Sequence, residues 1–218
     1  MLAHVYQAAS KCQQLAEVIV ATDSEEIMAV CKENGWNARM TSAEHRSGTD
    51  RVREVANSVP ADVYVNVQGD EPLARPEHID ALLRPMREGR VLVSTIKTLC
   101  PPEDISNPNA VKVVTGQEGL ALYFSRATIP FDRDGSGQAQ CFKHLGFYAY
   151  RIAALNQFCL LPESELERCE RLEQLRFLEN GISISVVETP YDTIGVDTEA
   201  DLRRVEAILL RQKGGQSG

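Results

Sequence analysis

The sequence predicts an α/β fold with a β-rich insertion, and three observations support that prediction. Short, continuous apolar runs recur along the 218 residues, as expected of parallel strands that are buried on both faces. Most of these runs are followed by a segment with apolar residues at helical spacing. The alternation is interrupted once, at about residues 100–151, where several strand-like runs follow one another. We therefore expect a parallel sheet with right-handed crossovers and one insertion.

The first half of the chain contains repeated strand and helix segments. Glu25 and Glu26 occupy the first turn of one helix, which Gly35 ends, and Pro76 opens another. The predicted strands cover residues 18–21, 37–40, 63–67 and 91–99, and the predicted helices cover 1–14, 25–34, 50–57 and the residues after Pro76.

The insertion and the final third complete the predicted domain. The insertion has strands at 111–115, 120–125 and 145–151, and Gly116-Gln117-Glu118-Gly119 indicates a hairpin between the first two. Ser164 and Glu167 form a capping box that begins a helix ending at Gly181. A strand at 182–187 and a helix from Thr198 follow. We expect a single domain over 1–211 and a frayed tail at 212–218.

Composition excludes several classes of protein. The net charge of -8 and the pI of about 5.1 disfavour non-specific nucleic-acid binding. No apolar run reaches the roughly 18 residues of a membrane helix, and the first residues do not resemble a signal peptide. The six cysteines form no C-x-x-C pair, so they are expected to be free thiols in a reducing cytosol. We expect a cytoplasmic protein without a nucleic-acid or membrane partner.

Two acidic residues follow apolar segments at places where α/β sheets bind ligands. Asp70 lies in the turn after strand 63–67, and Asp197 follows Ile194-Gly195-Val196 before a helix. Two carboxylates at two strand ends can hold Mg²⁺, which keeps water and phosphate oxygens in its shell. A ligand-free turn at Asp70 and a solvated Asp197 beside a helix cap remain alternatives.

Three other polar groups are candidates for substrate contacts. The loop 44–51 carries hydroxyls, amides and Arg51, which suit a base edge and a phosphate, although a plain surface loop has the same composition. The insertion contributes cationic side chains that suit a carboxylate-bearing sugar or a solvated surface. Those residues are Arg126, Arg133, Lys143 and His144. Glu173 and Gln174 lie among leucines in a predicted helix. This pattern is typical of a polar pair on the solvated face of a helix.

Eight motifs in a fixed order make the sequence specific. They are ATD (21–23), HRSGTDR (45–51), VNVQGDEP (65–72), NPNAVKVV (107–114), YFSRATIPFDRD (123–134), KHLGFYAYR (143–151), LEQLR (172–176) and GVDT (195–198). Together they closely resemble the CMP-Kdo synthetases, where Kdo is 3-deoxy-manno-octulosonate. The resemblance implies a Rossmann-like nucleotidyltransferase fold whose insertion helps to build a homodimer. It also implies the conversion of CTP and Kdo to CMP-Kdo and pyrophosphate for lipopolysaccharide synthesis.

The same resemblance implies roles for individual residues. Asp70 and Asp197 resemble the Mg²⁺ carboxylates, and Gln68 resembles the residue between nucleotide and sugar. The residues similar to the cytidine-side loop are Ser47, Gly48, Thr49 and Arg51. The residues similar to the sugar pocket are Arg126, Arg133, His144, Tyr148, Glu173 and Gln174.

Two departures from the family pattern carry expectations of their own. The family begins with an apolar strand, a Pro-Ala-Arg turn and a basic phosphate loop, and Met1 aligns after that loop. The 218 residues alone are therefore expected to be nearly inactive, because the loop's cations neutralise the triphosphate. Phe131 stands where Trp is more usual in the family.

Two alternatives to the implied function remain. The chain could be a truncated homologue that acts as a binding or partner protein, or a cytidylyltransferase for 8-amino-Kdo. The motifs LEQLR and RATIPF favour Kdo over a sialic acid.

Overall fold

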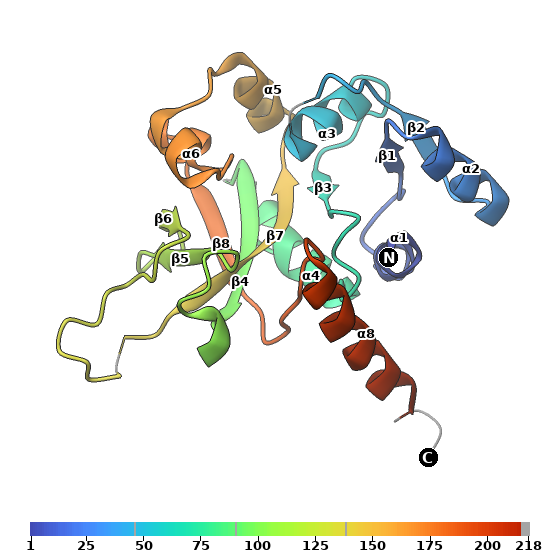
Figure 1. The fold of residues 1–218 in the computed structure, drawn as a ribbon. Helices are drawn as coiled ribbons and strands as arrows, with labels where there is room; N and C mark the ends of the chain where they lie inside the picture. Colours follow the sequence, from blue (N-terminus) through green and yellow to red (C-terminus); the bar gives the residue numbers. More distant parts are fainter. Residues whose placement is uncertain (46, 90, 138, 215–218) are drawn as a thin grey trace.

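The computed structural model describes residues 1–45, 47–89, 91–137 and 139–214 (Figure 1). Its helices are α1 (Leu2–Ser10), α2 (Glu25–Asn34), α3 (Gly48–Ala56), α4 (Pro76–Leu83), α5 (Ile152–Leu160), α6 (Glu165–Glu170), α7 (Leu175–Glu179) and α8 (Glu199–Gly214), with 3-10 turns η1 (Pro85–Glu88) and η2 (Pro102–Asp104). Its strands are β1 (Val20–Thr22), β2 (Ala38–Met40), β3 (Tyr64–Asn66), β4 (Val93–Leu99), β5 (Lys112–Thr115), β6 (Ala121–Ser125), β7 (Phe142–Tyr150) and β8 (Ile184–Glu188).

Strand β7 is the centre of a mixed six-stranded sheet. It pairs antiparallel with β3 and β5 and with β4, and β4 pairs parallel with β8. The three strands β3, β4 and β8 are therefore parallel to one another, as predicted. The prediction did not place an antiparallel strand between β3 and β4. The β-rich insertion accordingly contributes its last strand to the middle of the main sheet rather than forming a separate unit (Figure 1).

The hairpin β5–β6 folds back onto the far edge of the same sheet. Val113 pairs with Phe124 within the hairpin, whose turn spans Gly116 to Leu120 as the sequence indicated. The Val186 N–H donates to the Gly119 carbonyl at 2.8 Å, and Leu120 forms a bridge with Ser185 of β8. The hairpin thus connects β7 with β8 and closes one end of the sheet.

The first two strands form a sheet of their own. β1 pairs parallel with β2, and within the described residues neither is hydrogen-bonded to the six-stranded sheet. The β3 edge that faces away from β7 is likewise unpaired there. Tyr6 of α1 stacks on Trp36 at 4.7 Å between ring centroids, which fixes α1 against the loop after α2.

Alternating residues of β7 fill both faces of the sheet. Tyr148 and Tyr150 pack with Phe158 and Phe177 on one face, while Phe147 and Ala149 belong to a second cluster beneath α4. All six cysteines are free thiols, in agreement with the prediction. In the parts of the chain described above, no helix is both long and apolar enough to cross a membrane.

The helical third of the chain differs from its prediction. The sequence did not indicate α5, and the single helix expected from Ser164 to Gly181 is wrong. Arg171 adopts a left-handed conformation (φ 55°), which ends α6 and changes the chain direction before α7. The capping box at Ser164 and Glu167 is present. Helix α8 continues to Gly214, beyond the expected boundary at 211, and residues 215–218 lie outside the described chain.

Lys112 is a fully buried ammonium whose acceptors are backbone carbonyls. Its Nζ donates to the carbonyls of Asn107 (2.7 Å), Ala110 (2.6 Å) and Arg126 (2.8 Å). Three donors therefore hold a loop and the end of β6 together, and burial lowers the pKa of the ammonium.

We expect Lys112→Met to lower the free energy of unfolding by about 3 kcal/mol, because three buried acceptors lose a charged donor. Urea unfolding at neutral pH would measure the loss. Lys11→Met, at an exposed lysine, is the matched control and should change little. A loss no larger for Lys112→Met than for the control would contradict the expected effect.

Candidate active site

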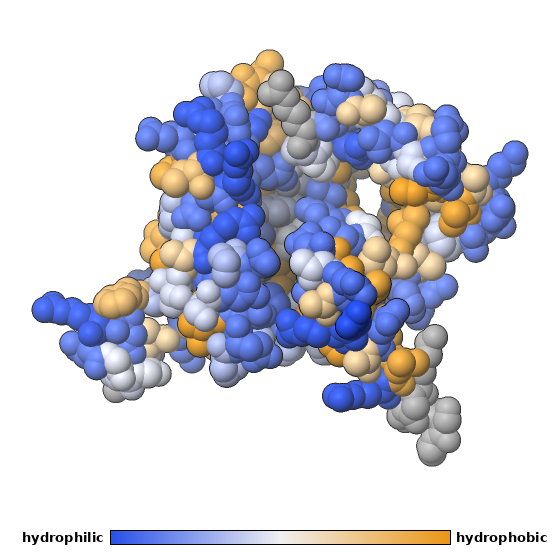
Figure 2. All heavy atoms as spheres, viewed as in Figure 1, coloured by the Kyte–Doolittle hydropathy of each residue, from blue (hydrophilic) through white to orange (hydrophobic). Residues whose placement is uncertain are grey.

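A cavity of about 750 Å³ opens where the sheet, the start of α3 and the α6–α7 turn meet. Figure 2 shows the hollow in this face, with hydrophilic side chains along both sides. The structure brings nine of the thirteen predicted site residues to its lining: Ser47, Gly48, Gln68, Arg126, His144, Tyr148, Glu173, Gln174 and Asp197. The other four are Thr49, Arg51, Asp70 and Arg133.

Asp70 and Asp197 are brought together by a backbone hydrogen bond. The Val196 N–H donates to the Asp70 carbonyl at 2.9 Å, so the residue that follows Val196 lies beside the turn after β3. The sequence argument placed Asp197 at a strand end, which is wrong. β8 ends at Glu188, and the segment from Thr189 to Asp197 is irregular.

The electrostatics of this pair suit a cation. Burial raises the pKa of the Asp70 carboxyl, and the nearby charge of Asp197 raises it further. Among the described residues, Asp70 Oδ1 is buried without a hydrogen-bond partner. No group of three or more His, Cys, Asp or Glu side chains with metal-binding geometry occurs in the described chain. A cation here would therefore take its remaining ligands from water and substrate, which is how Mg²⁺ is usually bound.

The start of α3 forms another wall of the cavity. Ser47 is its N-cap and accepts from the Asp50 N–H at 3.1 Å. A Cβ on Gly48 would lie 3.1 Å from Asn66 Nδ2, so glycine lets the helix start approach β3. Thr49 is fully buried beneath this wall, and its Oγ1 donates to Glu173 Oε1 at 2.8 Å.

Glu173 and Gln174 lie inward, contrary to the helix-face interpretation. Gln174 is 5% exposed, and Glu173 Oε2 is buried without a partner within the described chain. Burial raises the pKa of the Glu173 carboxyl. The turn at Arg171 is the cause, because it rotates the following residues relative to α6.

His144 is held as a neutral imidazole. Thr95 Oγ1 donates to the Phe147 carbonyl at 2.7 Å, so it accepts from His144 Nε2–H at 2.9 Å. We infer that His144 carries its proton on Nε2 and that Nδ1 is an acceptor. Burial lowers the pKa of His144 to about 3. The Tyr148 hydroxyl, also at the cavity, is buried without a partner among the described residues. This wall therefore offers an acceptor nitrogen and a free hydroxyl.

Arg126 is fixed by three backbone carbonyls. Its Nε donates to Glu170 O at 2.7 Å, and its Nη1 and Nη2 donate to Pro108 O and Arg171 O at 3.0 and 3.4 Å. The Glu170 carboxylate accepts the Arg126 N–H at 2.9 Å. A guanidinium held in this way contributes positive charge to the cavity without a neutralising side-chain partner of its own in the described chain.

Two predicted residues lie away from the cavity. Arg51 pairs with Asp23 at 3.2 Å and bonds Thr41, so it faces β1 and β2. Arg133 is exposed in the segment between β6 and β7, which extends away from the body of the protein (Figure 1). Spacing in the sequence placed both with their motif neighbours. The side-chain contacts of Arg51 turn it away from the cavity, whereas the backbone itself carries Arg133 away.

Sequence reasoning missed three polar residues of the cavity. Lys143 was considered as a donor for a carboxylate-bearing sugar or as a surface charge and was not kept among the site residues. It pairs with Asp104 at 3.0 Å and with Asp192 at 3.1 Å. Glu71 is half-buried and its Oε2 accepts from Thr193 Oγ1 at 2.7 Å, and desolvation of its carboxyl raises the pKa to about 7. Asn107 also lines the cavity. All three lie inside the eight motifs, which was the available signal.

Comparison with known proteins gives the family. Residues 1–184 match the cytidylyltransferase family. A protein of Koribacter versatilis (strain Ellin345) named 3-deoxy-manno-octulosonate cytidylyltransferase is 69% identical over 96% of this chain and 80% of its own length. A protein of the same name from Acidobacterium capsulatum is 57% identical over 98% of this chain and 87% of its own length.

Solved structures agree with the sequence relatives. The structure described as CMP:2-keto-3-deoxy-manno-octonic acid synthetase complexed with CTP has a TM-score of 0.91 and 41% identity, over 97% of this chain and 88% of its own. A 4-diphosphocytidyl-2C-methyl-D-erythritol synthase from Anaerococcus prevotii, at 16% identity and a TM-score of 0.63, shares the fold alone. The chain belongs to the cytidylyltransferase family and, within it, to the 3-deoxy-manno-octulosonate cytidylyltransferases, the CMP-Kdo synthetases.

Proposed function

We propose that this protein transfers a cytidylyl group from CTP to Kdo, forming CMP-Kdo and pyrophosphate for lipopolysaccharide synthesis. The observation that carries the proposal is the 69% identity to a relative that bears this activity in its name. The cavity supports it, because acidic, neutral polar and cationic side chains from separate motifs line one space. That distribution suits two anionic substrates and the charge that develops between them.

The reaction joins the two substrates directly. The anomeric hydroxyl of the sugar attacks the α-phosphorus of CTP in line, and the bond to pyrophosphate breaks. We assign Ser47, Gly48 and Gln68 to the nucleotide side, where the first N–H groups of α3 suit an anion or a base edge. Thr49 acts through Glu173, since its hydroxyl is buried against that carboxylate.

The sugar side combines fixed charge with neutral hydrogen-bonding groups. Arg126 provides a positive charge that the sugar carboxylate can approach. His144 Nδ1, the Tyr148 hydroxyl and Glu173 Oε2 are the groups available to sugar hydroxyls. Because these groups are buried, a sugar whose hydroxyls do not reach them leaves them without hydrogen-bond partners, which raises the free energy of its complex. This favours the selection of one sugar.

Mg²⁺ is the cofactor that we propose. Asp70 and Asp197 would hold it, in agreement with the buried Asp70 oxygen that has no hydrogen-bond partner in the described chain. When bound, Mg²⁺ would offset charge on the phosphate oxygens. Without it, the two carboxylates repel the triphosphate, so the chain's own residues oppose CTP binding at this edge.

We also propose that the protein acts in the cytoplasm, where CTP is available, and as a homodimer. Exposed apolar side chains support self-association: Phe131 is 82% exposed and Leu99 is 59% exposed, in and beside the extended segment. Sedimentation equilibrium of the purified protein would give its mass in solution.

The test uses the protein joined to the opening strand and phosphate loop of the family pattern, because the 218 residues alone are expected to be nearly inactive. Incubated with CTP, Kdo and Mg²⁺, this preparation, which is the wild type of the activity measurements below, should release pyrophosphate and form CMP-Kdo, both detected by mass spectrometry. ATP in place of CTP, and N-acetylneuraminate in place of Kdo, are the controls and should react far more slowly. A preference for 8-amino-Kdo over Kdo would favour the alternative cytidylyltransferase. Binding of CTP and Kdo without any product would instead support a binding protein.

A further inference from the structure

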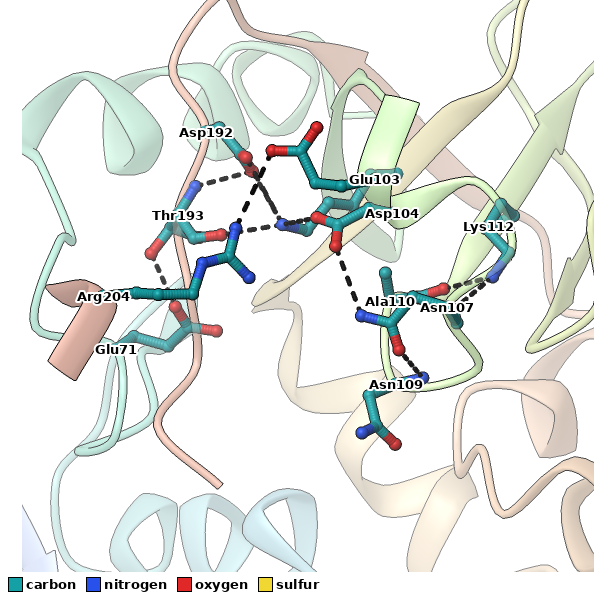
Figure 3. Close-up of polar contacts among 11 residues, drawn as sticks. Glu71, Glu103, Asp104, Asn107, Asn109, Ala110, Lys112, Asp192, Thr193 and Arg204 are labelled. Atoms are coloured by element: carbon teal, nitrogen blue, oxygen red, sulfur yellow. Dashed lines mark hydrogen bonds and ion pairs between the residues drawn. The ribbon is translucent and has the colours of Figure 1, made fainter. Parts of the chain in front are cut away.

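The largely buried ammonium of Lys143 connects the two sides of the cavity. Lys143 of β7 is 11% exposed at its side chain, and its Nζ contacts Asp104, Asp192 and the Thr193 carbonyl. Figure 3 shows Asp104 and Asp192 approaching one another from separate segments. Asp104 ends η2 on one side of the cavity, and Asp192 begins the segment that leads to Asp197 on the other.

The first branch of these contacts leads to the acidic pair. Lys143 Nζ donates to Thr193 O at 3.0 Å, and Asp192 Oδ1 accepts the Thr193 N–H at 2.8 Å. Thr193 Oγ1 donates to Glu71 Oε2. Three residues later, Val196 bonds the Asp70 carbonyl. The irregular segment before Asp197 is therefore held at its start by Lys143 and at its end by the turn after β3.

The second branch leads to the sugar side. The Asp104 carboxylate, 4% exposed, accepts from Lys143 Nζ at 3.0 Å and from Asn107 Nδ2 at 3.2 Å. Asn107 Oδ1 accepts the Asn109 N–H at 3.0 Å (Figure 3). The Pro108 carbonyl between them is one of the three acceptors that fix Arg126. The loop that orients Arg126 is thus attached to Lys143 through Asp104.

The charges in this cluster favour the ionised forms. Burial alone would lower the pKa of Lys143, but Asp192 and Asp104 outweigh it and raise that pKa. Burial opposes ionisation of Asp104, yet the Lys143 ammonium lowers the pKa of its carboxyl. The three donors of the ammonium match two carboxylates and one carbonyl, so no donor is left for a substrate in this arrangement.

We propose that Lys143 is a positioning residue that sets the distance between the Asp70–Asp197 pair and the Arg126 loop. The inference rests on the proposed function. It assigns a separate task to each contact: Asp192 and Thr193 keep Asp197 in place for the cation, while Asp104 keeps the 104–110 loop and Arg126 in place for the sugar acid. One side chain fixes both because it lies on the central strand between them.

The two tasks predict separable effects of two conservative substitutions. Asp104→Asn puts an amide against the ammonium and loosens the loop, so the KM for Kdo should rise about tenfold or more. Asp192→Asn retains the acceptor for the Thr193 N–H but weakens the hold on the segment before Asp197. The Mg²⁺ concentration at the midpoint of the thermal shift, with CTP present, should therefore rise about tenfold.

Each variant should leave the other quantity near its wild-type value, and Lys143→Met should raise both. Glu103→Gln is the charge-matched control, because Glu103 neighbours Asp104 but is exposed and lies 3.8 Å from Arg204. It should change neither quantity. If Lys143→Met fails to fold, the two asparagine variants, which keep the side-chain shape, still decide the question.

Two results separate this inference from the proposed function. A wild-type protein that makes no CMP-Kdo overturns the proposed function. A wild-type protein that makes it, with variants that only lower the melting temperature or that change both quantities equally, overturns the positioning role of Lys143 alone.

Discussion

Asp70→Asn should nearly abolish CMP-Kdo formation and yet raise the melting temperature of the metal-free protein. The carboxyl is partly buried, its Oδ1 has no partner in the described chain, and its pKa is raised by burial and by Asp197. The folded state therefore opposes the charge, and a neutral isostere removes that cost. The same charge is what a cation requires, so its loss should reduce kcat/KM by roughly 10²–10³-fold.

Activity and thermal unfolding should be measured on the same preparations at neutral pH, with and without Mg²⁺. Asp62→Asn, at an exposed carboxylate that does not line the cavity, is the control and should match wild type in both. The stabilisation should shrink or reverse when Mg²⁺ and CTP are added, because those ligands stabilise only the wild-type site. An active Asp70→Asn protein, or one destabilised without metal, would show that Asp70 is a structural residue.

His144→Gln should make the protein less sensitive to acid. In the folded state burial lowers the pKa of His144 to about 3 from its ordinary 6.5, so the unfolded chain binds one more proton between these values. The stability that neutral His144 allows is complete above pH 6.5 and is lost as the pH falls toward 3. This group alone contributes up to about 1.4 kcal/mol per pH unit in that window. Glutamine keeps a donor for Thr95 and does not titrate.

Urea unfolding at intervals from pH 7 to pH 4 would measure this difference. The wild-type free energy of unfolding should fall more steeply than that of His144→Gln, with nearly equal values at pH 7. His4→Gln, on the half-exposed face of α1, is the matched control and should follow wild type. Parallel curves for wild type and His144→Gln would mean that His144 is accessible to protons in the folded protein.

Local sequence signals determined most of the elements and many of the site residues. Apolar runs located β3, β4 and β8. Turn-forming glycines located the hairpin turn at Gly116, and a helix-capping pattern located the capping box at Ser164. The motifs named nine residues that line the cavity. Arg51 was not brought there, because a motif does not fix the direction of a long side chain. Arg133 was not brought there, because its segment extends away from the body of the protein.

Sequence by itself determined which segments become strands and helices, which family the motifs resemble, and which acidic and basic residues belong to them. Only the tertiary structure decided how these parts meet. It placed antiparallel β7 between β3 and β4, turned Glu173 inward at Arg171, and gave Lys143 its two carboxylate partners. The physical reason is range. Periodicity and capping depend on residues a few positions apart in the chain. Strand pairing and buried ion pairs join residues that are far apart in the chain, as Lys143 and Thr193 are, 50 positions from one another. Their choice depends on burial summed over the whole fold, which short-range patterns do not contain.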